Sequence, residues 1–75
     1  MENKHRVEIT TRDLVMRAWQ NSMELTRDFE IYSKEIHDAP EVAQTFARFA
    51  EEEGLHAAKL KAFLHAYTQN DAYRS

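Results

Sequence analysis

The chain has 75 residues, of which 10 are basic and 13 are acidic, and it contains no cysteine. This length supports one small domain, and without disulfides such a domain usually needs a metal or a partner subunit for stability. The charges are intermixed, which argues against a nucleic-acid or anionic-membrane partner, and no apolar run suits a signal sequence or a membrane span. We therefore expect a soluble, cytoplasmic protein.

Two long helices are predicted, because the chain has only one glycine and one proline and therefore little turn-forming sequence. Residues 1–9 carry no helical periodicity and are interpreted as an arm. A first helix is predicted over 10–37, with Thr10 or Thr11 as the N-cap and Asp13 in its first turn. Pro40 disfavours helical geometry at Ala39, so a turn is predicted at 38–39, then a second helix over 40–69 and a tail over 70–75.

The first predicted helix carries a wide apolar arc that one neighbouring helix cannot cover. Two long helices with so short a link fold back as an antiparallel hairpin. The fold class is therefore all-α, and a two-fold homodimer would close the hairpin into a four-helix bundle. The arc comprises a main stripe and a second patch: Leu14, Val15, Ala18, Ser22, Leu25, Phe29, Tyr32 and Ile36, then Met16, Trp19, Met23 and Ile31.

The second predicted helix carries a Glu-x-x-His pair within its apolar stripe. Glu53 and His56 take the positions at which the alternating three- and four-residue spacing of that stripe calls for apolar residues, so the stripe predicts that both are buried. Burying an ionised carboxylate is unfavourable unless it is paired or binds a metal. A metal-ligand pair is the preferred interpretation, and a buried salt-bridged pair at the dimer interface is the alternative. The stripe consists of Val42, Phe46, Phe49, Leu60, Phe63 and Tyr67 around the pair.

A carboxylate from the first helix would complete the set. With the turn centred near 38 and 39, Glu24 is as far before it as Glu53 is after it. Asp28 is the reserve ligand, and the alternative for Glu24 is a surface glutamate that pairs with Arg27. In a dimer, Glu24, Glu53 and His56 of both chains would supply four carboxylates and two imidazoles, a di-metal set whose binding is linked to dimerisation.

Several segments carry a family resemblance: Phe29-Glu30-Ile31-Tyr32, Asp38-Ala39-Pro40-Glu41-Val42, Phe46-Ala47-Arg48-Phe49-Ala50-Glu51-Glu52-Glu53, His56-Ala57 and Leu60. Over roughly residues 14–67 the chain resembles the ferritin-like superfamily, in particular rubrerythrin-type domains. In architecture it resembles encapsulated ferritins, two-helix half-ferritins that build a ferroxidase centre across a dimer interface. The resemblance implies that Glu53, His56 and Glu24 are the metal ligands.

One position departs from the family pattern, in which the first-helix glutamate precedes a tyrosine by seven residues. Leu25 is seven residues before Tyr32, and Glu24 is eight. Either Ile31 takes the tyrosine position or a one-residue π-bulge lies between Glu24 and Tyr32. We predict the bulge, because such bulges are common at functional sites.

The predicted function is a di-iron ferroxidase, an oxidoreductase or iron-storage protein, with Tyr32 as a nearby hydrogen-bonding or redox group. Carboxylates and imidazoles suit iron, with manganese or another divalent metal as alternatives. The alternative function is a metal-free helical oligomerisation module with a degenerate site. The patch around Trp19 and Met23 predicts a further subunit contact, which would build a ring or a tetramer. The resemblance also implies an encapsulin shell as a partner, but Ser75 closes the sequence without the C-terminal extension that would hold an encapsulin-targeting peptide, so residence in a shell is not supported.

Overall fold

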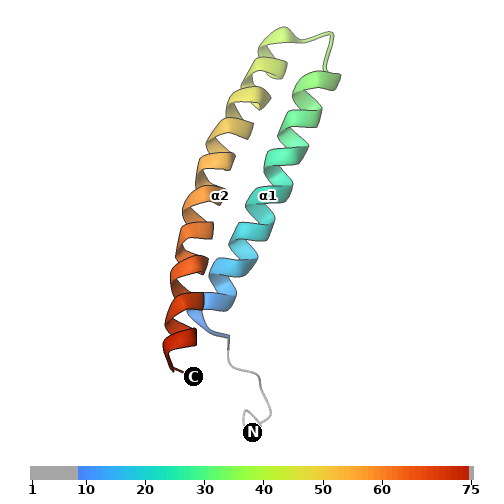
Figure 1. Cartoon of the computed structure of the whole chain (residues 1–75). Coiled ribbons are helices and arrows are strands. Elements are labelled where there is room, and N and C mark those ends of the chain that lie inside the picture. Colours follow the sequence, from blue (N-terminus) through green and yellow to red (C-terminus); the bar gives the residue numbers. More distant parts are fainter. Residues whose placement is uncertain (1–8, 75) are drawn as a thin grey trace, which may run out of the picture.

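A computed structural model describes residues 9–74, with side-chain positions up to Tyr67. The chain forms two helices, α1 (Thr11–Glu35) and α2 (Pro40–Arg74), which pack against each other as an antiparallel hairpin (Figure 1). The described residues contain no strand. The predicted all-α hairpin is therefore confirmed.

The first helix begins with a capping box, which identifies Thr10 rather than Thr11 as the N-cap. The Asp13 N–H donates to the Thr10 hydroxyl over 3.1 Å, and the Thr10 N–H donates to the Asp13 carboxylate over 3.1 Å. These bonds satisfy two amides that the helix end would otherwise leave without partners. The donation from the Thr10 backbone, followed by the Thr10 hydroxyl contact, lowers the pKa of Asp13. Residues 1–8 of the predicted arm lie outside the described residues.

The link between the helices spans residues 36–39, so α1 ends two residues before the predicted boundary at 37. Ile36 is extended, with φ −85° and ψ 116°, and its N–H still donates to the Tyr32 carbonyl over 3.1 Å. The extended residue starts the reversal of the chain while the Ile36 side chain stays half-buried. Pro40 then opens α2 as predicted, because its fixed φ suits the first helical position.

The second helix is longer than predicted. It continues to Arg74, whereas the predicted boundary was Gln69 and residues 70–75 were assigned to a tail. That assignment was wrong for 70–74, a segment with no glycine or proline to end the helix. Ser75 lies outside the described residues.

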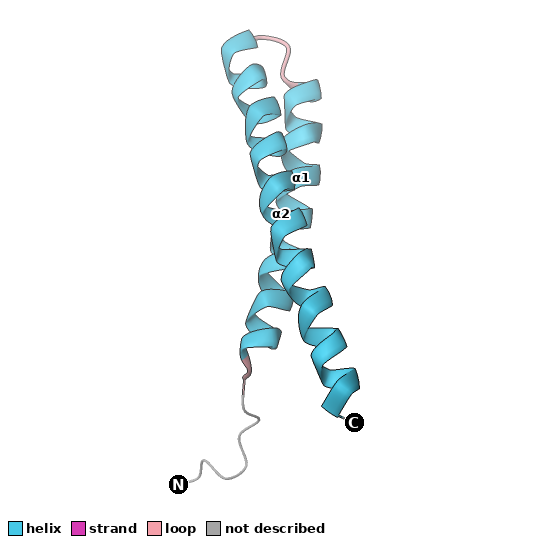
Figure 2. Cartoon of the chain, turned by 60° about the vertical axis from the view of Figure 1, so that its left-hand side comes forward, coloured by secondary structure: helices cyan, strands magenta, loops and turns pink. Residues whose placement is uncertain are grey.

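The helix interface is built on small residues. Among the residues whose side chains are described, the buried apolar residues of α2 are Ala50, Ala57 and Leu64, which are spaced seven apart, and the buried residue of α1 is Ser22. Alanine and serine let the two backbones approach closely, and Figure 2 shows the helices crossing and then diverging toward the N-terminal end of α1 and the C-terminal end of α2. No large side chain is fully buried among the described residues.

The observed interface is rotated relative to the predicted apolar stripe of α2. Residues 46, 53, 60 and 67 are half-buried, but residues 42, 49, 56 and 63 are exposed. The prediction that His56 is buried was therefore wrong for the hairpin. Bulky side chains alternate with alanines on this helix, and the hairpin packs its alanines inward, which turns half of the bulky positions toward one flank.

An aromatic cluster holds the helices together near the link. The ring centroids of Phe29 and Phe46 are 5.7 Å apart, those of Phe29 and Phe49 are 5.8 Å apart, and those of Tyr32 and Phe46 are 5.6 Å apart. Such contacts contribute beyond their buried area. The cluster fixes the register of the hairpin at its closed end.

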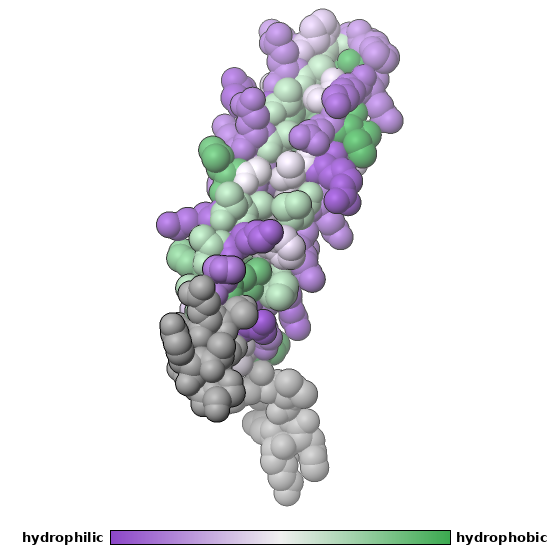
Figure 3. Space-filling view, in the orientation of Figure 1, coloured by the Kyte–Doolittle hydropathy of each residue, from purple (hydrophilic) through white to green (hydrophobic). Residues whose placement is uncertain are grey.

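One flank of the hairpin, here called the tryptophan face, is defined by Trp19 and Met23 of α1 and Gly54 and Ala58 of α2. These residues line one groove. The ammonium group of Lys61 lies 5.9 Å from the centre of the Trp19 ring. Apolar side chains gather between polar edges on the surface that Figure 3 presents.

The opposite flank, here called the histidine face, follows from helix geometry. Leu25 and Met23 fall on opposite sides of the line from α1 to α2, as do His56 and Ala58 on α2. Because Met23 and Ala58 line the tryptophan face, Leu25 and His56 lie on the other flank. Six apolar residues of this face are 40–56% exposed: Leu14, Leu25, Tyr32, Val42, Phe49 and Phe63.

Candidate metal centre

Three polar side chains meet at the middle of the hairpin. The Ser22 hydroxyl of α1 donates a hydrogen bond of 2.8 Å to Oε2 of Glu53. The other carboxylate oxygen of Glu53, Oε1, lies 3.5 Å from Nδ1 of His56 one turn along α2. The structure therefore brings Glu53 and His56 together as predicted, and it adds Ser22.

The Glu53 and His56 side chains differ in exposure. The Glu53 side chain is 19% exposed, and the His56 side chain is 66% exposed. Glu53 is therefore held inside the hairpin, whereas His56 stands on its surface. Without a metal their contact is an ion pair only when His56 is protonated.

The spacing of these donor atoms fits a shared metal ion. Oxygen and nitrogen ligands lie about 2.0–2.2 Å from a zinc ion, so two such ligand atoms at a tetrahedral angle are about 3.4 Å apart. Oε1 of Glu53 and Nδ1 of His56 are 3.5 Å apart. One chain thus offers two ligands in suitable positions, which is half of a four-ligand set.

Glu24 does not join the pair. Helix α1 is a continuous α-helix, so the predicted π-bulge was wrong, and Glu24 is exposed. Glu24 is two positions after Ser22, which turns Glu24 about 160° away from the direction of α2. The next residue, Leu25, rather than Glu24, lies on the histidine face.

The remaining first-helix candidates are also apart from the pair. Tyr32 is 44% exposed and its ring packs on Phe46 at the closed end. Asp28 is half-buried. Within residues 9–67, no three histidine, aspartate or glutamate side chains are close enough together to hold a metal ion. The predicted three-residue half-site is therefore not assembled within one chain.

Ser22 was not predicted as a site residue, although a signal for it was present. It is the one polar member of the main stripe of the first helix. Ser22 precedes the centre of the 36–39 link by as many residues as Glu53 follows it, so the two residues lie at the same height in the hairpin. The prediction centred the turn near 38 and 39, one residue later, and therefore paired Glu53 with Glu24 instead of Ser22.

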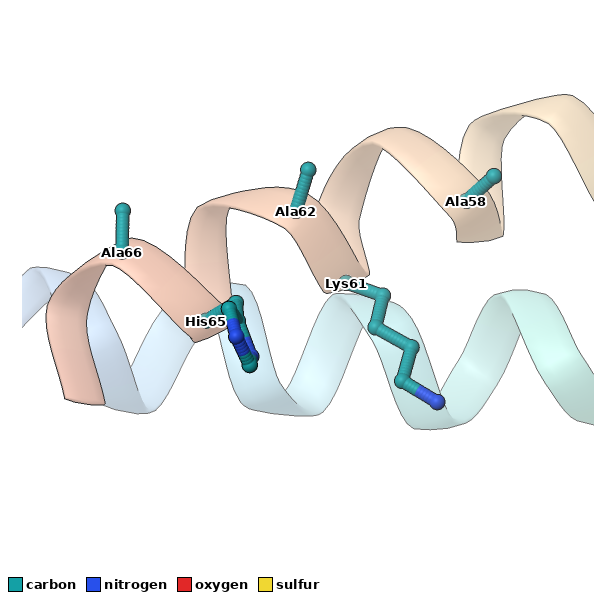
Figure 4. A pocket seen from close by; sticks show the side chains of 5 residues that line it. All are labelled: Ala58, Lys61, Ala62, His65 and Ala66. Carbon is teal, nitrogen blue, oxygen red and sulfur yellow. The ribbon is translucent and has the colours of Figure 1, made fainter. Parts of the chain in front are cut away.

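A second groove lies on α2 near the open end of the hairpin, with three alanines and two basic or titratable side chains around it. Figure 4 shows Ala58, Ala62 and Ala66 on the side of α2 away from α1, with Lys61 and His65 directed toward α1. No described carboxylate lines this groove. It therefore lacks the mixed donors of the Glu53–His56 pair.

Neither helix combines the length and the apolar character that crossing a membrane requires, as far as the described residues go. Comparisons with protein families, with curated proteins and with solved structures found no match to this chain.

Proposed function

We propose that this chain forms a homodimeric four-helix bundle and binds a divalent transition metal between its subunits, with Glu53 and His56 of each subunit as ligands. The observation that carries the proposal is the 3.5 Å separation of Glu53 Oε1 and His56 Nδ1 on an exposed apolar face. Two such pairs supply two carboxylates and two imidazoles. These donors suit iron, zinc, cobalt and related ions.

The hairpin needs a partner because its own core is small. Its buried apolar residues are two alanines and one leucine, and no large side chain within the described part is fully buried. The histidine face, which includes His56, leaves six larger apolar residues 40–56% exposed along its length. Covering this face removes apolar area from water, which favours association.

A second copy is the occupant that the donor set favours. The pair on one chain is half of a four-ligand site, and a two-fold axis beside His56 repeats the same half. Apolar residues then surround a polar centre, as in other bundles that hold metals on facing helices. Metal binding and dimerisation stabilise each other, because the complete site exists only in the dimer.

Iron(II) is the ion that the ferritin-like resemblance implies, and its oxidation is the reaction. In that reaction four iron(II) ions give one electron each to dioxygen, which takes up four protons to form two waters. Glu24, the α1 carboxylate that the resemblance assigns to the site, does not lie with Glu53 and His56. Metal binding is therefore the function that the geometry supports best, and ferroxidase activity remains a prediction from the resemblance.

Anaerobic titration with iron(II) followed by exposure to air tests both statements. We expect iron to bind to the wild-type dimer, and Glu53→Ala and His56→Ala to abolish binding. Ferric absorption that develops faster than in protein-free buffer supports the ferroxidase prediction. Binding that survives both substitutions contradicts the proposed site.

A metal-free oligomerisation module is the second candidate. The Ser22–Glu53 hydrogen bond favours it, because this bond gives the carboxylate a partner without any metal. Under this function the dimer forms equally well with a chelator present. Dimerisation that is independent of metal and of His56 identifies this second function.

A further inference from the structure

Ser22 and Glu53 meet in a way that distinguishes the two carboxylate oxygens. Oε2 of Glu53 accepts the Ser22 hydroxyl over 2.8 Å, and Oε1 faces His56 Nδ1 over 3.5 Å. Ser22 is 6% exposed, so its hydroxyl has little access to water as an alternative partner. The carboxylate is therefore held in one orientation, with one oxygen turned inward and the other toward the histidine.

We propose that Ser22 is a positioning residue that makes Glu53 a one-oxygen ligand, so that each dimer binds a single metal ion rather than a di-metal pair. This inference rests on the proposed intersubunit site. A carboxylate that bridges two ions through both of its oxygens, one on each ion, needs both oxygens available to metal. The Ser22 hydroxyl competes for Oε2, which leaves Oε1 for the metal.

The donor count leads to the same stoichiometry. Without Glu24, the two chains supply one Oε1 and one Nδ1 each, which is four ligands. Four ligands complete one tetrahedral ion. Two ions would share the same four groups and would each lack half of a coordination sphere.

The partly buried Ser22–Glu53 hydrogen bond also explains how the Glu53 carboxylate tolerates its position when no metal is bound. Glu53 is 19% exposed, and the Ser22 hydroxyl compensates part of its lost hydration. Hydrogen bonds to ligating carboxylates orient them, and their removal typically lowers metal affinity 10–100-fold. Ser22 therefore acts on the metal through Glu53.

Cobalt(II) titration of the full chain, followed by its visible absorption, tests the proposal. We expect saturation at one cobalt per dimer with the intense bands of a four-coordinate ion. Ser22→Ala should lower the affinity roughly 10–100-fold and change the band positions. Ser22→Thr, which retains a hydroxyl, should restore both.

Ser33→Ala is the matched control, because the Ser33 hydroxyl donates to the Glu30 carbonyl of its own helix, away from the pair. It should leave the cobalt affinity and spectrum unchanged. Circular dichroism of each variant checks that the hairpin is folded. Should Ser22→Ala fail to fold, the wild-type stoichiometry and the Ser22→Thr spectrum still decide the matter.

The outcomes separate this inference from the proposed function. Wild-type protein that binds no cobalt contradicts the proposed site itself. Saturation at two ions per dimer, or a Ser22→Ala variant with wild-type affinity and bands, overturns the role of Ser22 while leaving the intersubunit site in place.

Discussion

The Ser22 hydroxyl lies 2.8 Å from Oε2 of Glu53, a hydrogen bond between residues 31 positions apart in the chain. It joins the two helices at a point where their contact is made by alanines and this serine. The bond makes the Glu53 carboxylate a part of the packing of the hairpin. Its strength is therefore measurable without any metal.

A double-mutant cycle with Ser22→Ala and Glu53→Ala should give a coupling free energy of about 1–2 kcal/mol, because a hydrogen bond to a charged, largely buried group is stronger than a neutral one. Urea unfolding with a chelator present, at one fixed protein concentration, measures it. Additive effects of the two substitutions would show that the hydrogen bond contributes nothing to stability.

Thr10→Ala should lower the free energy of unfolding by about 1 kcal/mol at neutral pH, because α1 loses its capping box. Thermal or urea unfolding measures the loss. Thr11→Ala is the control, since Thr11 is the neighbouring threonine but not the cap, and it should have a smaller effect.

The capping contribution should depend on pH. The pKa of Asp13 in the folded chain is below its ordinary value of 3.8 because Thr10 donates to its carboxylate. The charged form is thus favoured in the folded state, and its contribution is present above pH 3.8 and lost as pH falls through the lower folded pKa. The gap between wild type and Thr10→Ala should narrow on acidification below pH 3.8. A gap that stays constant there contradicts the role of Asp13.

A charged residue introduced on the histidine face should weaken the dimer, whereas one introduced on the tryptophan face should not. Phe63 on the histidine face is 45% exposed, and Met23 on the tryptophan face is 40% exposed. Phe63→Glu should raise the dimer dissociation constant at least tenfold, because it buries a carboxylate in the proposed interface. Sedimentation velocity over a dilution series measures this effect.

Met23→Glu is the matched control for that experiment. It should leave the metal-linked dimer intact and remove only larger assemblies, if the tryptophan face makes the further contact predicted from Trp19 and Met23. Equal loss of the dimer in both variants would contradict the assignment of the interface to the histidine face.

Gly54→Ala should stabilise the hairpin by about 1 kcal/mol. A glycine within a helix is less favourable than alanine by about that amount, and a methyl group added at Gly54 meets no atom within 4 Å. Urea unfolding of the variant measures the gain. A loss of stability instead would mean that another subunit approaches Gly54 closely on the tryptophan face.

The hairpin could be predicted from local signals. Thr10 and Pro40 mark the starts of both helices, and the scarcity of glycine and proline excludes most other architectures. Glu53 and His56 are near each other because they are three positions apart on one helix, which needs no knowledge of tertiary structure. These features depend on positions that are close in sequence.

The parts that could not be predicted depend on how the helices rotate against each other. The choice between alanines and bulky residues for the interface is made by packing, and the hairpin places Ala50, Ala57 and Leu64 inward. That rotation exposes His56 and leaves Glu24 on the surface. A shift of one residue in the position of the turn also decides whether Ser22 or Glu24 faces Glu53.

The most direct test of intersubunit metal binding is sedimentation of the full chain near its dimer dissociation constant, with zinc or with a chelator. Zinc at about 100 times its dissociation constant should tighten the dimer by about 2.7 kcal/mol, roughly a hundredfold. Glu24→Ala should behave as the wild type, whereas Glu53→Ala and His56→Ala should lose the response to zinc. A wild-type dimer whose dissociation constant is the same with zinc and with chelator would contradict the account.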